Sequence, residues 1–355
     1  MKSKLFSFGL LTASVLFICT GQANAAEYTF TDLGTLGGHY SHADAINNAG
    51  QVAGAATSAG DTWYATVWNG NTPTAVGGTH SEGRAINDAG QVAGFSGSQA
   101  TVWNGATVTT LGGAGSFAYA INEAGQVAGI SGSHATVWNG TTATDLGTLG
   151  GTNSKATAIN NTGQVAGYSS TTNNYSSHAV IWNGTTATDL GSPLGGTDSY
   201  AYAINDVGQV AGMATLTGNT IGHAVVWNGT IATDLGSPGG SSYAFAINNI
   251  GQVAGYAEFG NRTPHAILWS NNTAIDLNSY LDSSIVGAGW LLLGATGIND
   301  NGWIVGVMRN SVSGYTHGFL LSVSAVPEPE THTMMFAGLG LIGFMLQRRK
   351  GIQAI

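Results

Sequence analysis

The sequence predicts an all-β fold, and three observations favour a seven-bladed β-propeller of four-stranded blades. A segment of the form Ala-Ile-Asn, followed after a turn by Gln-Val-Ala-Gly, recurs along the chain, with a divergent seventh copy at residues 297–306. Each copy carries signals for two tight turns, and hence for four short strands. The isoleucines of the copies lie at positions 46, 86, 121, 159, 204, 247 and 298, and a period of about 40–45 residues is typical of propeller blades.

The first turn of each repeat has the form Asn-x-x-Gly, as in residues 160–163. Asparagine at the first position and glycine at the fourth suit a type I turn followed by a residue in the left-handed region. We therefore expect this turn to join an Ala-Ile strand to a Gln-Val-Ala-Gly strand.

The second turn contains Trp-Asn-Gly, and Asn-Gly between two β-prone runs is a strong hairpin signal. In the fourth repeat it joins the strand at residues 178–182 to the strand at residues 186–191. Glycine and alanine are frequent in the strands, which indicates close packing of neighbouring blades. We expect Leu190, Ile204 and their equivalents to pack between blades. The turn recurs at Trp68, Trp103, Trp138, Trp182 and Trp227.

The two ends of the repeat array are complementary. Residues 28–38, YTFTDLGTLGG, match the fourth strand of the other repeats, whereas the last repeat ends with HGFLLS at residues 317–322 and lacks that strand. If the N-terminal strand completes the last blade, the ring closes and no sheet edge stays unpaired. A β-solenoid has the same repeat but no use for this offset, and it is the alternative fold.

Residues 1–25 have the pattern of a secretory signal peptide. Lys2 and Lys4 precede an apolar run at residues 5–18, and Ala23 and Ala25 form a small-x-small cleavage site. Cys19, the single cysteine, lies in this segment, so we expect no disulfide in the exported chain.

The C-terminal residues combine a short motif, an apolar stretch and a basic cluster. Pro327, Glu328 and Pro329 precede the apolar residues 331–346, and residues 348–350 are Arg-Arg-Lys. Sixteen residues form a helix of about 24 Å, shorter than the roughly 30 Å of a hydrocarbon core. We expect a short transmembrane helix suited to temporary retention, and a plain C-terminal membrane anchor is the alternative.

Taken together, these C-terminal residues resemble the PEP-CTERM sorting tag of Gram-negative bacteria. The resemblance implies recognition by an exosortase, in addition to the signal peptidase, and an association with exopolysaccharide production. We divide the chain into a signal peptide (1–25), a repeat domain (26–325) and a sorting tag (326–355). The expected destination, beyond the inner membrane, is the cell surface or the extracellular matrix, with the membrane contacted only through the temporary helix.

The repeat itself resembles the bacterial HAF extracellular repeat, which is defined by a His-Ala-Phe segment. The first two letters are kept in most copies, and His317 and Phe319 keep the first and third letters in the last copy. The first two copies depart further, with Tyr64 and Gln99 in place of histidine. The resemblance implies an extracellular repeat protein and names no substrate. The copies that keep His-Ala begin at His134, His178, His223 and His265.

The charge of the central region excludes some partners. Without the five basic and two acidic residues of the two termini, four basic and sixteen acidic residues remain, which gives residues 26–325 a formal net charge of about −12. Such an acidic surface argues against binding to nucleic acid or anionic lipid.

The residue before each Ala-Ile-Asn segment differs from repeat to repeat, and it lies on the strand expected to be innermost. We expect these residues near the mouth of a central channel, where aromatic rings and polar loops suit sugar binding; packing between blades is the alternative role. The candidate ligand-binding residues are Asp44, Arg84, Tyr119, Tyr202 and Phe245, with Thr157 and Thr296 in the remaining repeats and Tyr40, Phe117, Tyr200 and Tyr243 nearby.

No cofactor or metal site is expected from the sequence. The recurrent histidines are distributed one per repeat, whereas metal ligands must converge, so each is expected to hydrogen-bond a neighbouring strand or loop. His39 and His42 are close enough in sequence to share an ion, but no third ligand is evident. Asp145, Asp189, Asp234 and Asp276 recur at one repeat position, which indicates a structural role.

Three hypotheses for the function follow. The favoured one is a secreted, non-catalytic surface or biofilm-matrix protein that binds exopolysaccharide by its loop face. The second is a polysaccharide-active hydrolase or lyase, which requires unrepeated groups such as Asp44, Asp61, Glu82, Glu258 or His42 to meet in one cleft. The third is a structural adhesin or spacer without a ligand.

Overall fold

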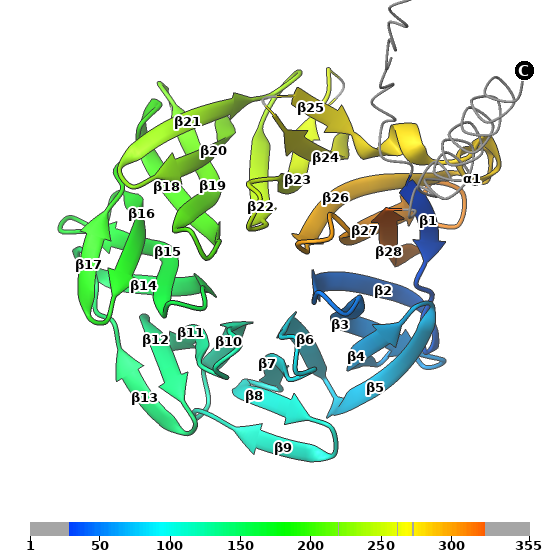
Figure 1. Cartoon of the computed structure of the whole chain (residues 1–355), viewed down its shortest axis with the longest axis horizontal. Coiled ribbons are helices and arrows are strands. Elements are labelled where there is room, and N and C mark those ends of the chain that lie inside the picture. The colour runs from blue at the N-terminus through cyan, green and yellow to red at the C-terminus, as the bar shows by residue number, and fades with distance from the viewer. Residues whose placement is uncertain (1–27, 219, 261, 272, 324–355) are drawn as a thin grey trace, which may run out of the picture. The chain divides into compact units, whose positions relative to one another are not determined.

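The strands form antiparallel sheets that follow one another around a central opening (Figure 1). The structure is a computed structural model, and it describes residues 28–218, 220–260, 262–271 and 273–323. The signal peptide and the sorting tag, including the helix expected at residues 331–346, lie outside the described residues.

Five sheets have four strands each, in chain order from the opening outward (Figure 1). They are β6 (Ser81–Ile86), β7 (Val92–Ser96), β8 (Gln99–Asn104) and β9 (Thr107–Thr110); β10 (Ser116–Ile121), β11 (Val127–Ser131), β12 (His134–Asn139) and β13 (Thr142–Asp145); β14 (Gly150–Ile159), β15 (Gln164–Thr171), β16 (Ser177–Asn183) and β17 (Thr186–Asp189); β18 (Gly195–Ile204), β19 (Gln209–Leu216), β20 (Gly222–Asn228) and β21 (Ile231–Gly236); and β22 (Ser242–Ile247), β23 (Val253–Glu258), β24 (Pro264–Ser270) and β25 (Thr273–Asp276).

One further sheet has eight strands and contains both ends of the described chain. Its order is β26-β27-β28-β2-β3-β4-β5, with β1 also paired to β28. β2 and β28 are joined only by the parallel pair Tyr40 and Thr316. The strands are β1 (Tyr28–Asp32), β2 (Gly37–Ile46), β3 (Gln51–Ser58), β4 (Trp63–Asn69), β5 (Thr72–Thr79), β26 (Trp290–Ile298), β27 (Ile304–Asn310) and β28 (Thr316–Val323).

The N-terminal strand lies where the offset of the repeat predicts it. β1 pairs antiparallel with β28 over its whole length, from Tyr28 opposite Val323 to Asp32 opposite Phe319. The Tyr28 hydroxyl also donates to the carbonyl of Gly302 at 3.2 Å. A linear stack of repeats, the alternative fold, does not bring its first strand to its last one.

The turn geometry within a repeat also agrees with the prediction. Gly163 has a φ of +83°, in the left-handed region, and its N–H donates to the carbonyl of Asn160 at 3.0 Å. Glycine is needed in the Gln-Val-Ala-Gly strand for a different reason. A Cβ on Gly167 would overlap the carbonyl oxygen of Lys155 on the inner strand. Close approach of these two strands therefore requires glycine.

Small and large residues alternate in the cores between sheets. Leu190 and Ile204 belong to one buried cluster with Trp227, so they pack across the boundary between two sheets, as expected. The tryptophan that precedes each Asn-Gly turn fills the core: Trp68, Trp138, Trp182 and Trp227 are fully buried. Their indole N–H groups have no hydrogen-bond partner, so these residues act through packing alone.

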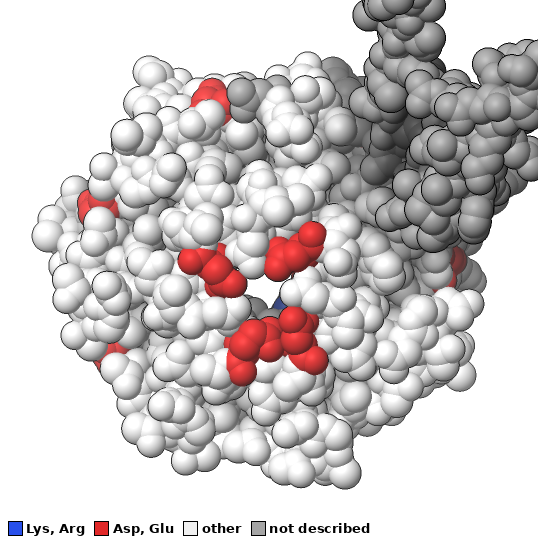
Figure 2. Space-filling view, in the orientation of Figure 1, with Lys and Arg blue, Asp and Glu red and all other residues white. Residues whose placement is uncertain are grey.

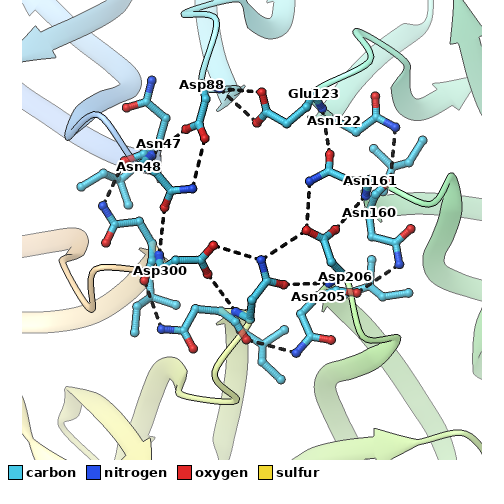
Figure 3. Close-up of a pocket in the computed structure, with 18 of the residues that line it drawn as sticks. Asn47, Asn48, Asp88, Asn122, Glu123, Asn160, Asn161, Asn205, Asp206 and Asp300 are labelled. Atoms are coloured by element: carbon cyan, nitrogen blue, oxygen red, sulfur yellow. Dashed lines mark hydrogen bonds between the residues drawn. The ribbon is translucent and has the colours of Figure 1, made fainter.

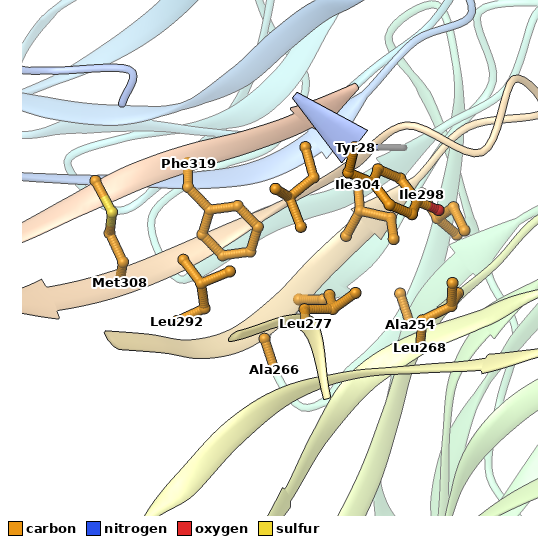
Figure 4. Close-up of a cluster of buried hydrophobic side chains, with 12 residues drawn as sticks. Tyr28, Ala254, Ala266, Leu268, Leu277, Leu292, Ile298, Ile304, Met308 and Phe319 are labelled. Atoms are coloured by element: carbon orange, nitrogen blue, oxygen red, sulfur yellow. The ribbon is translucent and has the colours of Figure 1, made fainter. Parts of the chain in front are cut away.

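A short non-repeating segment precedes the last sheet. It contains the 3₁₀ helix η1 (Leu277–Tyr280) and the helix α1 (Ser283–Gly287). The buried Leu277 of η1 packs with Tyr28, Leu292 and Phe319 in one cluster that joins β1, β26 and β28 (Figure 4). The insertion therefore stabilises the region in which β1 and β28, the first and last described strands, pair.

Candidate functional site

The central opening is bordered at one end by the Asn-x-x-Gly turns that follow the inner strands. The asparagine of each Ala-Ile-Asn segment is buried, and its side-chain amide donates to the backbone carbonyl of the same asparagine in the next repeat (Figure 3). These bonds measure 3.0–3.1 Å and run from Asn47 to Asn87, Asn122, Asn160, Asn205, Asn248, Asn299 and back to Asn47. The repeats are thus joined in a closed circle of hydrogen bonds.

The next residue in each turn forms a second circle, nearer the centre of the opening than the first (Figure 3). Its backbone N–H donates to the side chain of the equivalent residue in the next repeat, as Asn161 does to Asp206 at 2.8 Å. The members are Asn48, Asp88, Glu123, Asn161, Asp206, Asn249 and Asp300. Its four acidic members surround the opening on this face (Figure 2). We call this circle the acidic rim, and it encloses a cavity of 170 Å³.

Farther along the inner strands, towards the other end of the opening, the side chains no longer repeat. Two positions per strand are partly exposed between buried small residues, because successive side chains of a strand point to opposite faces. In β18 they are Tyr200 and Tyr202, on either side of the buried Ala201. The candidate residues of the sequence analysis occupy the second of these positions.

Four charged side chains of β2 and β6 converge. The Nδ1 atom of His42 lies 2.9 Å from Asp44, and Arg84 contacts both Asp44, at 3.4 Å, and Glu82, at 2.5 Å. The Nε2 atom of His42 is 3.9 Å from Glu82. We call His42, Asp44, Glu82 and Arg84 the charged cluster.

Two opposing effects act on the pKa of His42. Burial alone lowers the pKa, but the charge and hydrogen bond of Asp44 raise it more, and the net result is a pKa above 6.5. Arg84 opposes this rise and Glu82 supports it. The charged cluster therefore favours a protonated His42.

Aromatic rings occupy the same positions on β10, β18 and β22. The ring centroid of Tyr202 lies 5.5 Å from that of Phe245 and 6.5 Å from that of Tyr200, with which it stacks. The ammonium group of Lys155 lies 3.8 Å from the ring centroid of Tyr119. Burial, followed by the neighbouring tyrosines, raises the pKa of Tyr202, so its hydroxyl stays protonated at physiological pH. We call Tyr119, Tyr200, Tyr202, Tyr243 and Phe245 the aromatic arc; all five rings remain partly exposed.

The candidates thus fall into two groups. Asp44 and Arg84 belong to the charged cluster, whereas Tyr119, Tyr202 and Phe245 belong to the aromatic arc. The rings of Tyr202 and Phe245 contact each other, so packing between inner strands, the alternative role, is part of what these two do. Thr157 and Thr296 instead donate to backbone carbonyls of a neighbouring inner strand, at 2.8 and 2.6 Å.

The unrepeated acids do not all meet. Asp44 and Glu82 share the charged cluster, but Asp61 pairs with His39 at 3.0 Å and Glu258 accepts from the backbone of Ser241 at 3.1 Å. His39 and His42 therefore have separate partners. Within the described residues, no group of three or more histidine, cysteine or acidic side chains is arranged to hold a metal ion.

The recurrent histidines pair with the recurrent aspartates. His178 contacts Asp189 at 2.9 Å, eleven residues away across the hairpin, and four further copies repeat this contact. In the last sheet the partner of His317 is Asp32 of β1, also at 2.9 Å. The expectation that each histidine bonds to a neighbouring strand or loop is confirmed for these pairs, which are His134–Asp145, His178–Asp189, His223–Asp234, His265–Asp276 and His317–Asp32.

Sequence reasoning missed the acidic rim, and it missed the part that Arg84 has in the charged cluster. The rim could have been found by reading the residue after each Ala-Ile-Asn segment as well as the one before it. His42, Asp44 and Glu82 are three of the unrepeated groups considered for one cleft, and the structure brings these three together.

Comparison with known families identifies the C-terminal residues. Residues 325–350 match the PEP-CTERM protein-sorting motif, which confirms the prediction for this segment and indicates an exported surface protein processed by an exosortase. The match gives no support to the HAF resemblance of the central repeats. Among the described residues, no helix has the length and hydrophobicity needed to cross a membrane.

Comparison with whole proteins adds little. No curated protein matches the chain significantly. A mutant of the Aleuria aurantia lectin AAL in complex with Fucα1-6GlcNAc is similar in structure at 15% identity and a TM-score of 0.39, over 85% of this chain and 97% of the lectin. A mutant of AofleA from Arthrobotrys oligospora is similar at 13% identity and a TM-score of 0.36, over 83% and 86%. TM-scores this low support no inference about this chain.

Proposed function

We propose that the chain is a non-catalytic surface protein that binds exopolysaccharide, built as a seven-bladed β-propeller. In this count the eight-stranded sheet provides two blades, β2 to β5, and β26 to β28 with β1. The producer is a Gram-negative bacterium in which signal peptidase removes residues 1–25 and an exosortase processes the tag at 326–355. The domain of residues 26–325 then resides on the cell surface or in the biofilm matrix.

The observation that carries this proposal is the set of unrepeated side chains at the opening. The turns, the tryptophans and the His–Asp pairs recur along the chain. The side chains of the inner strands that face the opening, and those of the loops, differ from copy to copy. The aromatic arc offers partly exposed rings on which the apolar face of a sugar can stack. The charged cluster adds acceptors on Asp44 and Glu82 and donors on Arg84 for sugar hydroxyl groups.

The test is binding of the producer's own exopolysaccharide to the purified domain, measured by calorimetry. Replacing Tyr119 or Phe245 by alanine should weaken binding about tenfold or more, because stacked aromatic anchors dominate such interfaces. Tyr175→Ala is the matched control, since this ring is 89% exposed in the loop between β15 and β16 and outside the arc. Unchanged binding by both arc variants, with wild-type unfolding curves, contradicts the proposal.

A hydrolase or lyase is the second candidate, because His42, Asp44 and Glu82 converge in the charged cluster. A glycosidase pair requires one protonated and one charged carboxyl group. Here a single guanidinium contacts both carboxylates, which favours binding over catalysis. Release of reducing ends from the exopolysaccharide, abolished by Glu82→Gln, would establish the second candidate in place of the first.

A further inference from the structure

We propose a second ligand site, distinct from the central opening, that binds a negatively charged sugar residue through its carboxylate. The site is a cavity of 530 Å³ between the loop that follows β23 and the beginning of β26. Arg262 and Arg309 line it, together with Leu291 and Leu293. The carboxylate of the ligand is inferred from the cavity itself, and only its sugar part rests on the proposed function.

One feature of the cavity, a bulge in β26, occurs once in the repeating fold. β26 has a register shift between Leu292 and Gly294, a place at which the other inner strands are regular. Leu293 is the additional residue of this bulge, and a bulge redirects side chains. Leu292 is buried in the core, while Leu291 and Leu293 on either side are partly exposed and line the cavity.

Among the lysines and arginines of the described residues, Arg262 and Arg309 are the two without a side-chain partner in the described part of the chain. Arg84 is ion-paired and Lys155 lies over an aromatic ring, whereas neither Arg262 nor Arg309 forms a salt bridge or side-chain hydrogen bond within the described ranges. No acidic residue is among the described residues that line the cavity. Two unpaired guanidinium groups around one cavity, in a domain with sixteen acids and four bases, form a local site for an anion.

The backbone at Arg262 provides an independent observation. In the equivalent loops the residue in the left-handed region is a glycine, such as Gly97 or Gly218, or else Asp61 or Asn174, whose side chain accepts from a backbone N–H at 3.1 or 2.8 Å. Asp and Asn tolerate this region well, but Arg262 adopts it with a φ of +60°. Unfavourable backbone conformations persist where function requires the side chain, and here the conformation places a guanidinium at the cavity.

The chemistry of the lining selects the ligand class. A guanidinium group binds a carboxylate through two parallel hydrogen bonds that are strengthened by the opposite charges, whereas the hydroxyl groups of a neutral sugar carry no charge. Arg309 lies opposite Leu291 across the β26–β27 pair, so charged and apolar groups share one face of the sheet. A uronic acid residue presents both a carboxylate and an apolar ring face, and a cavity of this volume accommodates a ligand of one or two sugar rings.

The experiment is titration of the domain with D-glucuronate, with glucose as the neutral counterpart and acetate as the bare carboxylate. The account predicts that glucuronate binds at least tenfold more tightly than either, and that Arg262→Gly and Arg309→Gln each weaken it at least tenfold. Arg262→Gly should not lower the melting temperature, because glycine adopts a positive φ without strain. Asn174→Gly, the same change at the equivalent position of another loop, should leave glucuronate binding unchanged.

The outcomes separate this site from the one in the central opening. Equal binding of glucuronate and glucose, or wild-type affinity in both arginine variants, overturns the site. If acetate binds as tightly as glucuronate, the sugar ring contributes nothing, and the inference that the ligand is a sugar is overturned. Glucuronate binding that Tyr119→Ala leaves intact shows that this site stands even if the proposed function of the central opening fails.

Discussion

The asparagine of each Ala-Ile-Asn segment is the residue on which both the turn and the ring depend. Besides its bond to the next repeat, Asn160 donates to the side chain of Gln164 at 3.0 Å and accepts from the backbone N–H of Gln164 at 2.9 Å. One buried amide therefore shapes a hairpin and joins two sheets.

Asn160→Ala should lower the free energy of unfolding by about 2–4 kcal/mol, because it leaves the N–H of Gln164 without its partner and removes the bond to the carbonyl of Asn205, which then accepts only from the N–H of Gly208. Denaturant unfolding measures the effect. Asn161→Ala, the exposed neighbour in the acidic rim, is the control and should cost less than about 1 kcal/mol. Equal losses at the two positions would show that burial of the amide is not what matters.

The protonation of His42 gives a pH dependence. Its pKa in the folded protein is above the ordinary 6.5, so its contribution to stability is fully present below about pH 6.5 and is lost as the pH rises through the folded value. We expect the difference in unfolding free energy between the wild type and His42→Gln to be larger at pH 5.5 than at pH 8.5. The facing groups are Asp44, Glu82 and Arg84, and a difference that grows with pH would mean that Arg84 dominates.

At this scale the sequence predicts roles within a repeat better than contacts between repeats. The turn formed by Asn160 and Gly163 follows from four consecutive residues. The bond from Asn160 to Asn205 joins residues 45 positions apart, and it follows only from the packing of one sheet on the next. The contact between Asp44 and Arg84 was not predicted for the same reason.

Among the elements, β1 connects the beginning of the described chain to its end. Its Asp32 pairs with His317 of β28. In other copies, the aspartate comes from the fourth strand of the same repeat, as Asp189 of β17 does for His178. The first residue of β1, Tyr28, is buried in the cluster of β26 and β28. The strand is therefore integrated both by hydrogen bonds and by apolar packing.

A pair of cysteines tests this connection. Thr29 lies directly opposite Ser322, and facing Cα atoms of antiparallel strands are about 4.5–5.5 Å apart, within the range of a disulfide. In the chain without its signal peptide, Thr29→Cys with Ser322→Cys should form an intramolecular disulfide and gain about 2–4 kcal/mol of stability. Thr29→Cys with Ser177→Cys, a position in β16, is the control and should not cross-link within the chain. Cross-links only between molecules would contradict the pairing of β1 with β28.

The position of β1 could be predicted because the repeat is strict enough to reveal a missing strand. η1, α1 and the bulge at Leu293 could not, since they occur once and have no copy for comparison. The longest interval between copies, before the isoleucine at 298, was the only sign of them. The proposed arginine cavity depends on the bulge at Leu293, which is why the repeat pattern contains no trace of it.

For the whole molecule, the two ends of the inner strands differ in charge and in regularity. One end has the acidic rim, which repeats around the opening (Figure 2). Towards the other end lie the aromatic arc, the charged cluster and the arginine cavity, none of which repeats. An anionic polysaccharide should avoid the rim and contact the other end.

Hydrogen–deuterium exchange over the whole domain, with and without an oligosaccharide of the producer's exopolysaccharide, tests this claim most directly. The account predicts slower exchange in residues 116–121, 199–204 and 242–247 of the inner strands, with no change in the turns of the acidic rim. If the oligosaccharide contains uronic acid, residues 259–264 and 309–314 should also exchange more slowly. Protection confined to the rim turns, or absent throughout the domain at saturating ligand, would contradict the account.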